Sequence, residues 1–220
     1  MTQTTGADAP ELGLRERKKL RTRQLIAETA RGLFAERGFD HVTVAEIARA
    51  AEVSEQTVFN YFPTKEDLVY WRLETFEEDL LATIHQREPG ESVLRAFGRF
   101  VLQQRGLLAE QDPEARGRLV ELTRMITDSP ALLARERQIF ERYTASLAAL
   151  IADETGAGPD DVEPWVAANA LVGVHRALID HTRRHIVAGA PRARIRREVR
   201  AQGERALQAL ERGLGSIGGG

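Results

Sequence analysis

Apolar residues recur at helical spacing along almost all of the 220-residue chain, and no stretch alternates apolar and polar residues long enough to predict a strand. We therefore expect an all-α fold. A first helix carries Ile26 and Phe34 on one face and ends at Gly38, where a left-handed residue would bring Phe39 back onto Phe34. Later helices are expected over residues 64–86, 92–110, 113–126, 128–154, 161–188 and 192–212.

Three helix starts follow one another closely after this first helix. Thr43, with Glu46 three residues on, forms a capping box. Ser54 caps a second short helix, and Thr64 with Asp67 marks the start of a longer one. Each cap side chain competes with continuation of the helix and satisfies a new N-terminus. The pattern therefore predicts two short helices with a break at "AEVS" instead of one long helix.

Composition narrows the class of protein. Apolar residues make up 42 % of the chain and charged residues 29 %, which is ordinary for a soluble globular protein. The chain has no cysteine, so a disulfide, a thiolate nucleophile and a cysteine-ligated metal are excluded. No apolar run reaches the roughly 18 residues that span a bilayer, and the polar N-terminus lacks a signal-peptide stretch. We expect a cytoplasmic protein without a membrane segment.

The net charge of −2 hides a basic cluster at the start of the first helix. A helix N-terminus favours anions, so clustered cations there need another partner, and a phosphate backbone supplies one. A solvated helix start is the alternative interpretation. The cluster comprises Arg15, Arg17, Lys18, Lys19, Arg21 and Arg23.

Two short helices at a tight turn, the second with outward hydrogen-bonding side chains, are typical of a helix-turn-helix. The second helix of that motif enters the major groove of DNA. Helical spacing turns Val58 and Phe62 inward and leaves Gln56, Thr57 and Asn60 facing outward. Glutamine and asparagine can bond adenine bidentately, and a threonine methyl can touch thymine. Solvated polar residues on a small helix are the alternative interpretation. The three capped helix starts, the basic cluster and an outward aromatic residue at Tyr61 favour base contacts instead.

At this point the segment from Arg17 to about Leu68 resembles the TetR family of bacterial transcriptional regulators. The shared pattern runs through "LFAERGFDHVTVAEIARAAEVSEQTVFNYFPTKEDL", with its Gly-Phe helix stop, "T-x-x-x-I-A-x-x-A" and "V-S". The resemblance implies an all-helical homodimer whose N-terminal three-helix unit binds DNA. It also implies a larger C-terminal part that holds a ligand pocket and the dimer helices.

The resemblance further implies roles for single residues. Thr43 and Lys65 would contact phosphate, and Tyr61 occupies a place often held by a phosphate-binding histidine. Ala45 and Arg49 would lie on or beside the face that approaches the groove. The expected DNA contacts are Thr43, Ala45, Arg49, Ser54, Gln56, Thr57, Asn60, Tyr61 and Lys65.

Three positions depart from the family pattern. Glu52 stands where glycine is usual, so the turn must accept a carboxylate near DNA and a left-handed backbone. Gln56 replaces a frequent glycine, and Phe59 replaces the usual tyrosine and lacks its hydroxyl. These departures bear on the operator sequence and not on DNA binding.

In the C-terminal part, polar residues interrupt apolar helix stripes. Each such residue is either a satisfied hydrogen-bonding group of the core or a contact for a ligand. Taken together they favour a pocket for an apolar effector. The expected ligand-binding residues are Phe97, Phe100, Gln104, Tyr143, Trp165, Asn169, His175 and Arg176.

The last helix carries a continuous seam of apolar and small residues. Gly203 in that seam would allow close approach of a partner helix. The seam predicts a dimer interface, as the resemblance also implies, or equally a seam within one chain. Its residues are Ile195, Val199, Gly203, Leu207, Leu210 and Leu214.

The sequence does not favour a metal site or a catalytic site. His181 and His185 have the i, i+4 spacing of metal ligands, but no third carboxylate follows at a defined spacing, and Arg183 and Arg184 repel a cation. No glycine-rich phosphate loop and no Glu-x-x-His motif occur. We expect no metal, no cofactor and no enzymatic activity.

These observations predict four segments. Residues 1–14 form a tail, 15–63 a helix-turn-helix DNA-binding domain, 64–214 a ligand-binding and dimerisation domain, and 215–220 a flexible end. The expected function is a ligand-responsive repressor that binds a palindromic double-stranded operator as a homodimer and is released by a small-molecule effector. The competing hypothesis is a helical protein whose basic N-terminal unit docks on another protein or on a membrane surface.

Overall fold

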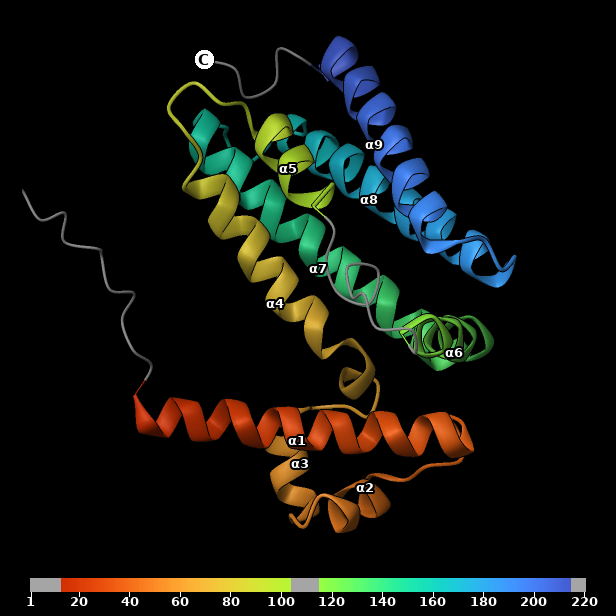
Figure 1. Cartoon of the computed structure of the whole chain (residues 1–220). Coiled ribbons are helices and arrows are strands. Elements are labelled where there is room, and N and C mark those ends of the chain that lie inside the picture. The colour runs from red at the N-terminus through yellow and green to blue at the C-terminus, as the bar shows by residue number, and fades with distance from the viewer. Residues whose placement is uncertain (1–12, 104–114, 215–220) are drawn as a thin grey trace, which may run out of the picture. The chain divides into compact units, whose positions relative to one another are not determined.

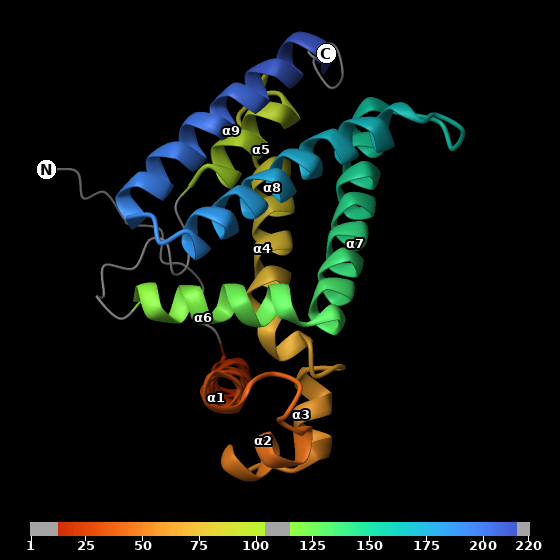
Figure 2. The same ribbon diagram turned by 90° about the vertical axis from the view of Figure 1, so that its right-hand side faces the viewer.

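The structure is a computed structural model that describes residues 13–103 and 115–214, and all regular structure in these ranges is helical (Figures 1 and 2). The expected all-α fold is confirmed. The chain divides into two compact units, Met1–Trp71 and Arg72–Gly220. The helices are α1 (Leu14–Arg37), α2 (Val44–Ala50), α3 (Glu55–Tyr61), α4 (Asp67–His85), α5 (Val93–Val101), α6 (Ala115–Asp128), α7 (Pro130–Thr155), α8 (Glu163–Val187) and α9 (Arg192–Leu214).

In the first unit, α2 and α3 pack on the same side of α1 (Figures 1 and 2). Helix α1 ends at Gly38, which has φ 82° and ψ 150°, a region open almost only to glycine. The Phe34 and Phe39 rings then meet with centroids 5.1 Å apart, as the spacing predicted. The core of this unit includes Ile26, Ala30, Phe34, Phe39, Val42, Ile47, Val58 and Phe62, all buried.

The two predicted caps that separate α2 from α3 are confirmed. The Thr43 side chain accepts a hydrogen bond from the Glu46 N–H, and the Ser54 side chain accepts one from the Thr57 N–H. Helix α4 begins later than expected, at Asp67. The Thr64 N–H and hydroxyl both donate to the Asp67 carboxylate over 2.9 Å, so a tight turn precedes the helix.

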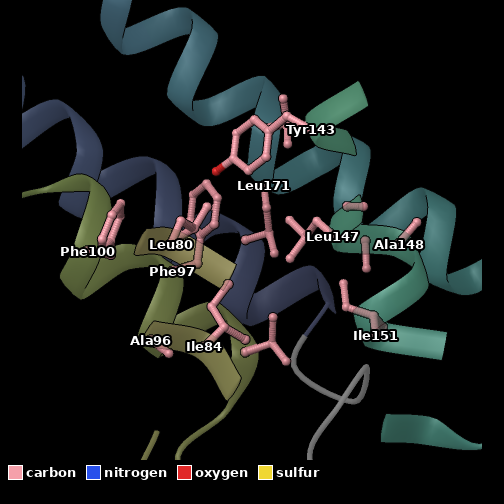
Figure 3. Close-up of a cluster of buried hydrophobic side chains, with 14 of the residues drawn as sticks. Leu80, Ile84, Ala96, Phe97, Phe100, Tyr143, Leu147, Ala148, Ile151 and Leu171 are labelled. Atoms are coloured by element: carbon pink, nitrogen blue, oxygen red, sulfur yellow. The ribbon is translucent and has the colours of Figure 1, made fainter. Parts of the chain in front are cut away.

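In the second unit, α8 packs against both α7 and α9. Side chains from five helices enclose one hydrophobic core (Figure 3). Full burial of each large apolar side chain contributes about 1.5–3 kcal/mol, so this core is the main source of stability in the unit. It includes Leu80 and Ile84 of α4, Phe97 and Phe100 of α5, Tyr143, Leu147 and Ile151 of α7, Leu171 of α8 and Leu207 of α9.

The apolar seam of α9 is used within its own chain. Ile195 and Leu207 are buried, and a Cβ at Gly203 would collide with the Leu102 side chain. A Cβ at Gly98 would lie 2.7 Å from Leu207 Cδ1, so both glycines permit close packing of α5 and α9. Of the two interpretations that the sequence allowed for this seam, the structure therefore supports the intramolecular one.

Helix α5 ends at Val101, short of the end near residue 110 that the sequence predicted, and residues 104–114 lie outside the described ranges. Gln104, an expected ligand contact, lies outside the described residues. Among the helices that the structure describes, none is both long and apolar enough to cross a membrane. The predicted functional boundary between residues 63 and 64 stays a prediction.

Candidate functional site

The outward face of α3 carries a hydrogen-bonded pair of amide side chains. Gln56 Nε2 donates to Asn60 Oδ1 over 3.1 Å, and both residues are exposed. They meet because residues four apart on a helix lie on one face. The pair leaves Gln56 Oε1 free to accept and Asn60 Nδ2 free to donate. A donor beside an acceptor complements the N7 and N6 edge of adenine in the major groove.

The start of α3 is held by two hydroxyl groups. Ser54 Oγ accepts from the Thr57 N–H over 3.0 Å, and it lies 2.7 Å from Thr57 Oγ1. These contacts fix the Thr57 side chain in one orientation at the N-terminal end of the helix. The Thr57 methyl group therefore lies at the N-terminal end of α3, which is the end that can reach a base edge in a helix-turn-helix.

Hydrogen bonds and an ion pair stabilise the start of α2. The Thr43 N–H and hydroxyl each donate to Glu46 Oε2 over 2.8 Å, and Arg37 Nη2 lies 2.7 Å from Glu46 Oε1. The Thr43 backbone hydrogen bond, followed by Arg37, lowers the pKa of Glu46 to about 2. Thr43 itself stays exposed, as does Arg49, while Ala45 is half-buried.

Lys65 binds the segment that connects α1 to α2. Its Nζ donates to the carbonyl oxygens of Phe39 and Val42 over 3.0 and 3.2 Å, and it lies 4.1 Å from the centroid of the Phe39 ring. An ammonium group has three donors, so one donor is left for an anion. Tyr61 is half-buried at the end of α3.

The basic cluster forms the first turns of α1. Arg15, Arg17, Lys18, Lys19 and Arg21 are all exposed. Like charges this close repel one another, and neutralisation by phosphates relieves that repulsion. The sixth cation, Arg23, is less exposed, and its guanidinium carbon lies 5.4 Å from the centroid of the Phe62 ring.

The turn between α2 and α3 contains an unusual backbone. Glu52 has φ 55° and is the only non-glycine residue with positive φ in the described ranges, which agrees with the left-handed turn expected there. The following Val53 N–H donates to the Ala48 carbonyl over 2.9 Å and closes the end of α2. A left-handed residue other than glycine costs about 1–2 kcal/mol, so the tight turn between the helices is maintained against a local strain.

The second unit contains a cluster of aromatic rings from four helices. Phe76 of α4 stacks on His175 of α8, with centroids 4.7 Å apart and an angle of 22° between the rings. Phe100 meets Phe76 edge-on at 5.0 Å. Tyr143 and Phe140 of α7 lie 6.2 and 5.8 Å from His175. Ring pairs in such arrangements contribute about 0.5–1.5 kcal/mol each beyond the area that they bury.

Two polar atoms in this cluster are buried without a partner. The Tyr143 hydroxyl and His175 Nδ1 make no hydrogen bond within the part of the chain that the structure describes. Burial lowers the pKa of His175 to about 4, and burial followed by the charge of Glu77 raises the pKa of Tyr143. Figure 3 shows the Tyr143 ring pointing from α7 into the core. Both groups are therefore neutral, and both are able to bond a ligand.

The other expected ligand contacts are divided between this core and the surface. Phe97 is buried beside Phe100. Trp165 is 50 % exposed, and Asn169 Nδ2 donates to the Trp165 carbonyl on the outer face of α8. The structure does not bring these two residues to the aromatic cluster. Arg176 is exposed as well, although its guanidinium carbon lies 5.6 Å from the centroid of the Phe140 ring.

Comparison with known proteins agrees with this geometry. Residues 26–70 match the family of bacterial regulatory proteins described as the tetR family, and residues 91–215 match the family described as the MftR C-terminal domain. The HTH-type transcriptional regulator TcmR of Streptomyces glaucescens is 33 % identical over 151 residues, which cover 68 % of this chain and 67 % of TcmR. The chain belongs to the TetR family. It is a DNA-binding transcriptional regulator and not an enzyme.

Two further proteins are similar over a larger share of the chain. The putative mycofactocin biosynthesis transcriptional regulator MftR of Mycobacterium tuberculosis is 25 % identical over 173 residues, or 75 % of this chain and 81 % of MftR. Native NalD, the secondary repressor of the MexAB-OprM multidrug efflux pump in Pseudomonas aeruginosa, is similar in fold. It has a TM-score of 0.52 and 23 % identity, and the match covers 88 % of this chain and 97 % of that chain.

Within this TetR-family chain, three aromatic residues were not among the site residues predicted from sequence, although Phe59 was noted there as a departure from the family pattern. Phe59 is 43 % exposed on α3, and the inward spacing of Val58 and Phe62 already contained the signal that it faces outward. Phe76 and Phe140 belong to the aromatic cluster of the second unit. Their partners lie on other helices, so only the tertiary fold reveals them.

Proposed function

We propose that this regulator is a repressor that binds a palindromic operator as a homodimer and is released by a small-molecule effector. The observation that carries the proposal is the polar face of α3, where Gln56 and Asn60 are exposed and bonded to each other. A surface that serves only to dock on protein or membrane would offer apolar anchors at these positions instead.

The proposed base contacts come from α3. Asn60 Nδ2 donates to N7 of an adenine, Gln56 Oε1 accepts from its N6 amino group, and the Thr57 methyl meets a thymine. Phe59 is exposed on the same short helix and adds an apolar contact to a base or sugar. The internal hydrogen bond between Gln56 and Asn60 supports this proposal, because it orients both amides before DNA arrives.

The proposed phosphate contacts surround this helix. Thr43 and Ser54 stand at the starts of α2 and α3, where backbone N–H groups favour an anion. Tyr61 is the last residue of α3, Lys65 follows that helix, and Arg49 lies in the last turn of α2. Ala45 lies beside these residues and allows the backbone to approach closely. The basic start of α1 adds attraction that does not depend on sequence.

The proposed dimer uses the outer face of α8. Val162, Trp165 and Val166 are 69 %, 50 % and 51 % exposed, which is unusual for large apolar side chains. Farther along the helix, Gly173 has open space around its Cβ position, so a partner helix could approach there. A second copy of the chain would cover this face and set two copies of α3 one turn of DNA apart, about 34–36 Å.

The proposed effector site is the aromatic cluster, with Phe97, Phe100, Tyr143 and His175 among the contacts predicted from sequence. Neutral rings and two unpaired polar atoms favour an uncharged aromatic molecule that both accepts and donates a hydrogen bond. Phe76 belongs to α4, a helix whose residues are shared between the two units. An effector that displaces Phe76 therefore acts on the helix that leads from the DNA-binding unit.

Release requires that the effector bind more tightly to the form that does not fit the operator. Selection of bound fragments from the host genome, followed by gel shifts at two salt concentrations, tests the proposal. Gln56→Ala and Asn60→Ala should each lose about 1–3 kcal/mol of discrimination between operator and mutated operator while keeping salt-sensitive general affinity. Gln202→Ala, which changes an exposed glutamine on α9, is the control.

Unchanged sequence preference in both α3 variants would refute the assignment of the base readers. Lys65→Ala should weaken binding to all sequences alike and reduce the slope of log K against log salt by about 0.9. A chain that ignores DNA at low salt but adsorbs to protein or membrane would support the docking hypothesis instead.

A further inference from the structure

Three side chains from α8 and α9 meet next to the turn that joins these helices. They are His181, His185 and Glu198, and one ligand atom from each lies within 4.8 Å of the other two. His185 Nε2 is 3.5 Å from Glu198 Oε2, and the two imidazole rings have centroids 4.3 Å apart. The sequence already contained the i, i+4 pair of histidines. The third ligand comes from α9 through the tertiary fold.

His181 has a ring nitrogen that is available to a metal. His181 Nε2 is buried and has no hydrogen-bond partner among the described residues. Burial, followed by the nearby His185 and Arg184, lowers the pKa of His181. A neutral imidazole with a free lone pair is the form that binds metal.

The charges around the cluster are more favourable than the sequence suggested. Arg183 Nη1 donates to Glu136 over 2.8 Å, so its charge is compensated by a carboxylate on α7. Glu198 Oε1 accepts from Arg194 Nε over 2.7 Å, which leaves Oε2 toward the histidines. Such an outer partner orients a ligating carboxylate. Arg184 is exposed, and its charge opposes a cation at this cluster.

We propose that His181, His185 and Glu198 form a site for a divalent metal of the zinc class, with the fourth position open to water. Two imidazoles and one carboxylate are a known ligand set for Zn²⁺. Ligand atoms about 2.0–2.2 Å from a tetrahedral metal lie roughly 3.3–3.6 Å apart. The His185–Glu198 distance of 3.5 Å already lies in this range, and small rotations of these half-buried side chains bring His181 into it.

A metal bound by these three residues would link α8 to α9 across the turn that contains Gly189, whose φ is 74°. Metal that binds the folded chain and not the unfolded chain raises its melting temperature. The proposal is independent of the effector site and of DNA recognition, because none of its residues belongs to the aromatic cluster or to α3.

The test uses the full chain without a polyhistidine tag, freed of metal by a chelator. Titration calorimetry with Zn²⁺ should show equimolar binding, and Co²⁺ should give the intense visible bands of a tetrahedral site. His181→Ala and His185→Ala should each weaken the apparent affinity by more than about 100-fold, because loss of an outer-shell partner alone costs about 10–100-fold. The matched controls His41→Ala and His85→Ala change exposed histidines elsewhere and should bind as the parent chain does.

Two further variants sharpen the result. Glu198→Gln should weaken Zn²⁺ binding while its melting temperature without metal shows that the helices remain folded. Arg184→Gln should tighten binding, because it removes the uncompensated cation. Zn²⁺ affinity that is equal in the parent chain, His181→Ala and His185→Ala, or the absence of binding at micromolar Zn²⁺, would overturn the site and leave only a His185–Glu198 ion pair.

Discussion

The two units of the chain differ in the exposure and hydrogen bonding of their polar side chains. On the outward face of α3 in the first unit, polar groups are bonded to near neighbours in sequence, as in Gln56 with Asn60 and Ser54 with Thr57. In the core of the second unit, the Tyr143 hydroxyl and His175 Nδ1 are buried without partners. The first arrangement suits the proposed contact with DNA in water, and the second suits the proposed binding of a small molecule that excludes water.

This difference affects both the stability of each unit and the way in which its polar groups can bind a partner. Local hydrogen bonds on an exposed face contribute little to stability, but they orient groups before DNA binds. A buried polar atom without a partner costs about 1–3 kcal/mol until something bonds it. In the proposed function, these two atoms of the second unit supply effector affinity at the expense of stability. The first unit depends for its fold on a small apolar core.

The largest effect is expected from that small core. Phe62→Ala should lower the free energy of unfolding of the first unit by about 3–5 kcal/mol, because the ring is 1 % exposed and its removal leaves a cavity. Operator binding should be lost while the helices of the second unit persist, which thermal unfolding followed by circular dichroism and gel shifts can measure.

Phe59→Ala is the matched control for that change, since Phe59 lies on the same helix and is 43 % exposed. Its unfolding free energy should change by no more than about 0.5 kcal/mol. If both variants lose similar stability, or if Phe62→Ala melts the whole chain in one step, the separation of the two units is wrong.

The next effect is acid sensitivity from His175. Its folded pKa of about 4 lies below the value of about 6.5 for an unfolded chain, so the unfolded state binds the proton more readily between these values. Stability is complete above about pH 6.5 and falls as the pH is lowered toward 4. Between pH 7 and pH 5 the loss should be about 2 kcal/mol.

Urea unfolding at a fixed protein concentration at the two pH values measures this loss. His175→Phe should reduce it, although not to zero, because His181 has a lowered pKa as well and acts in the same direction. His85→Ala, which changes an exposed histidine, is the control. Equal pH dependence in the parent chain and His175→Phe would show that His175 is not buried as described.

The same contrast explains how much could be predicted from sequence. The caps at Thr43 and Ser54 link residues three apart, so local spacing was enough to predict both breaks and the outward face between them. Gly203 in the apolar seam of α9 predicted close helix packing. The local sequence does not show whether the partner helix belongs to the same chain. Phe76 in the aromatic cluster and Glu198 beside the two histidines depend on contacts between distant segments. Such contacts require the tertiary fold.

A smaller effect is expected where the first unit would meet phosphate. Tyr61→Phe should weaken binding to operator and to unrelated duplex by the same factor, about tenfold, since a hydrogen bond to a charged group contributes about 1.5 kcal/mol or more. The salt slope should stay unchanged, because a neutral hydroxyl displaces no counterion. Fluorescence anisotropy at several salt concentrations measures both quantities. A change in sequence preference would make Tyr61 a base reader instead, and unchanged affinity would remove it from the interface.

The smallest expected effect separates a cap from an ordinary helix threonine. Thr43→Ala removes the acceptor for the Glu46 N–H and one of the donors to its carboxylate, and should cost the first unit about 1 kcal/mol in urea unfolding without DNA. Thr22→Ala is matched to it, because the Thr22 hydroxyl donates to the Lys18 carbonyl within α1 and caps nothing. Alanine is favoured inside a helix, so Thr22→Ala should be neutral or slightly stabilising. Equal losses in the two variants would mean that α2 is held by its packing and not by its cap, and that the local polar network of the first unit contributes orientation alone.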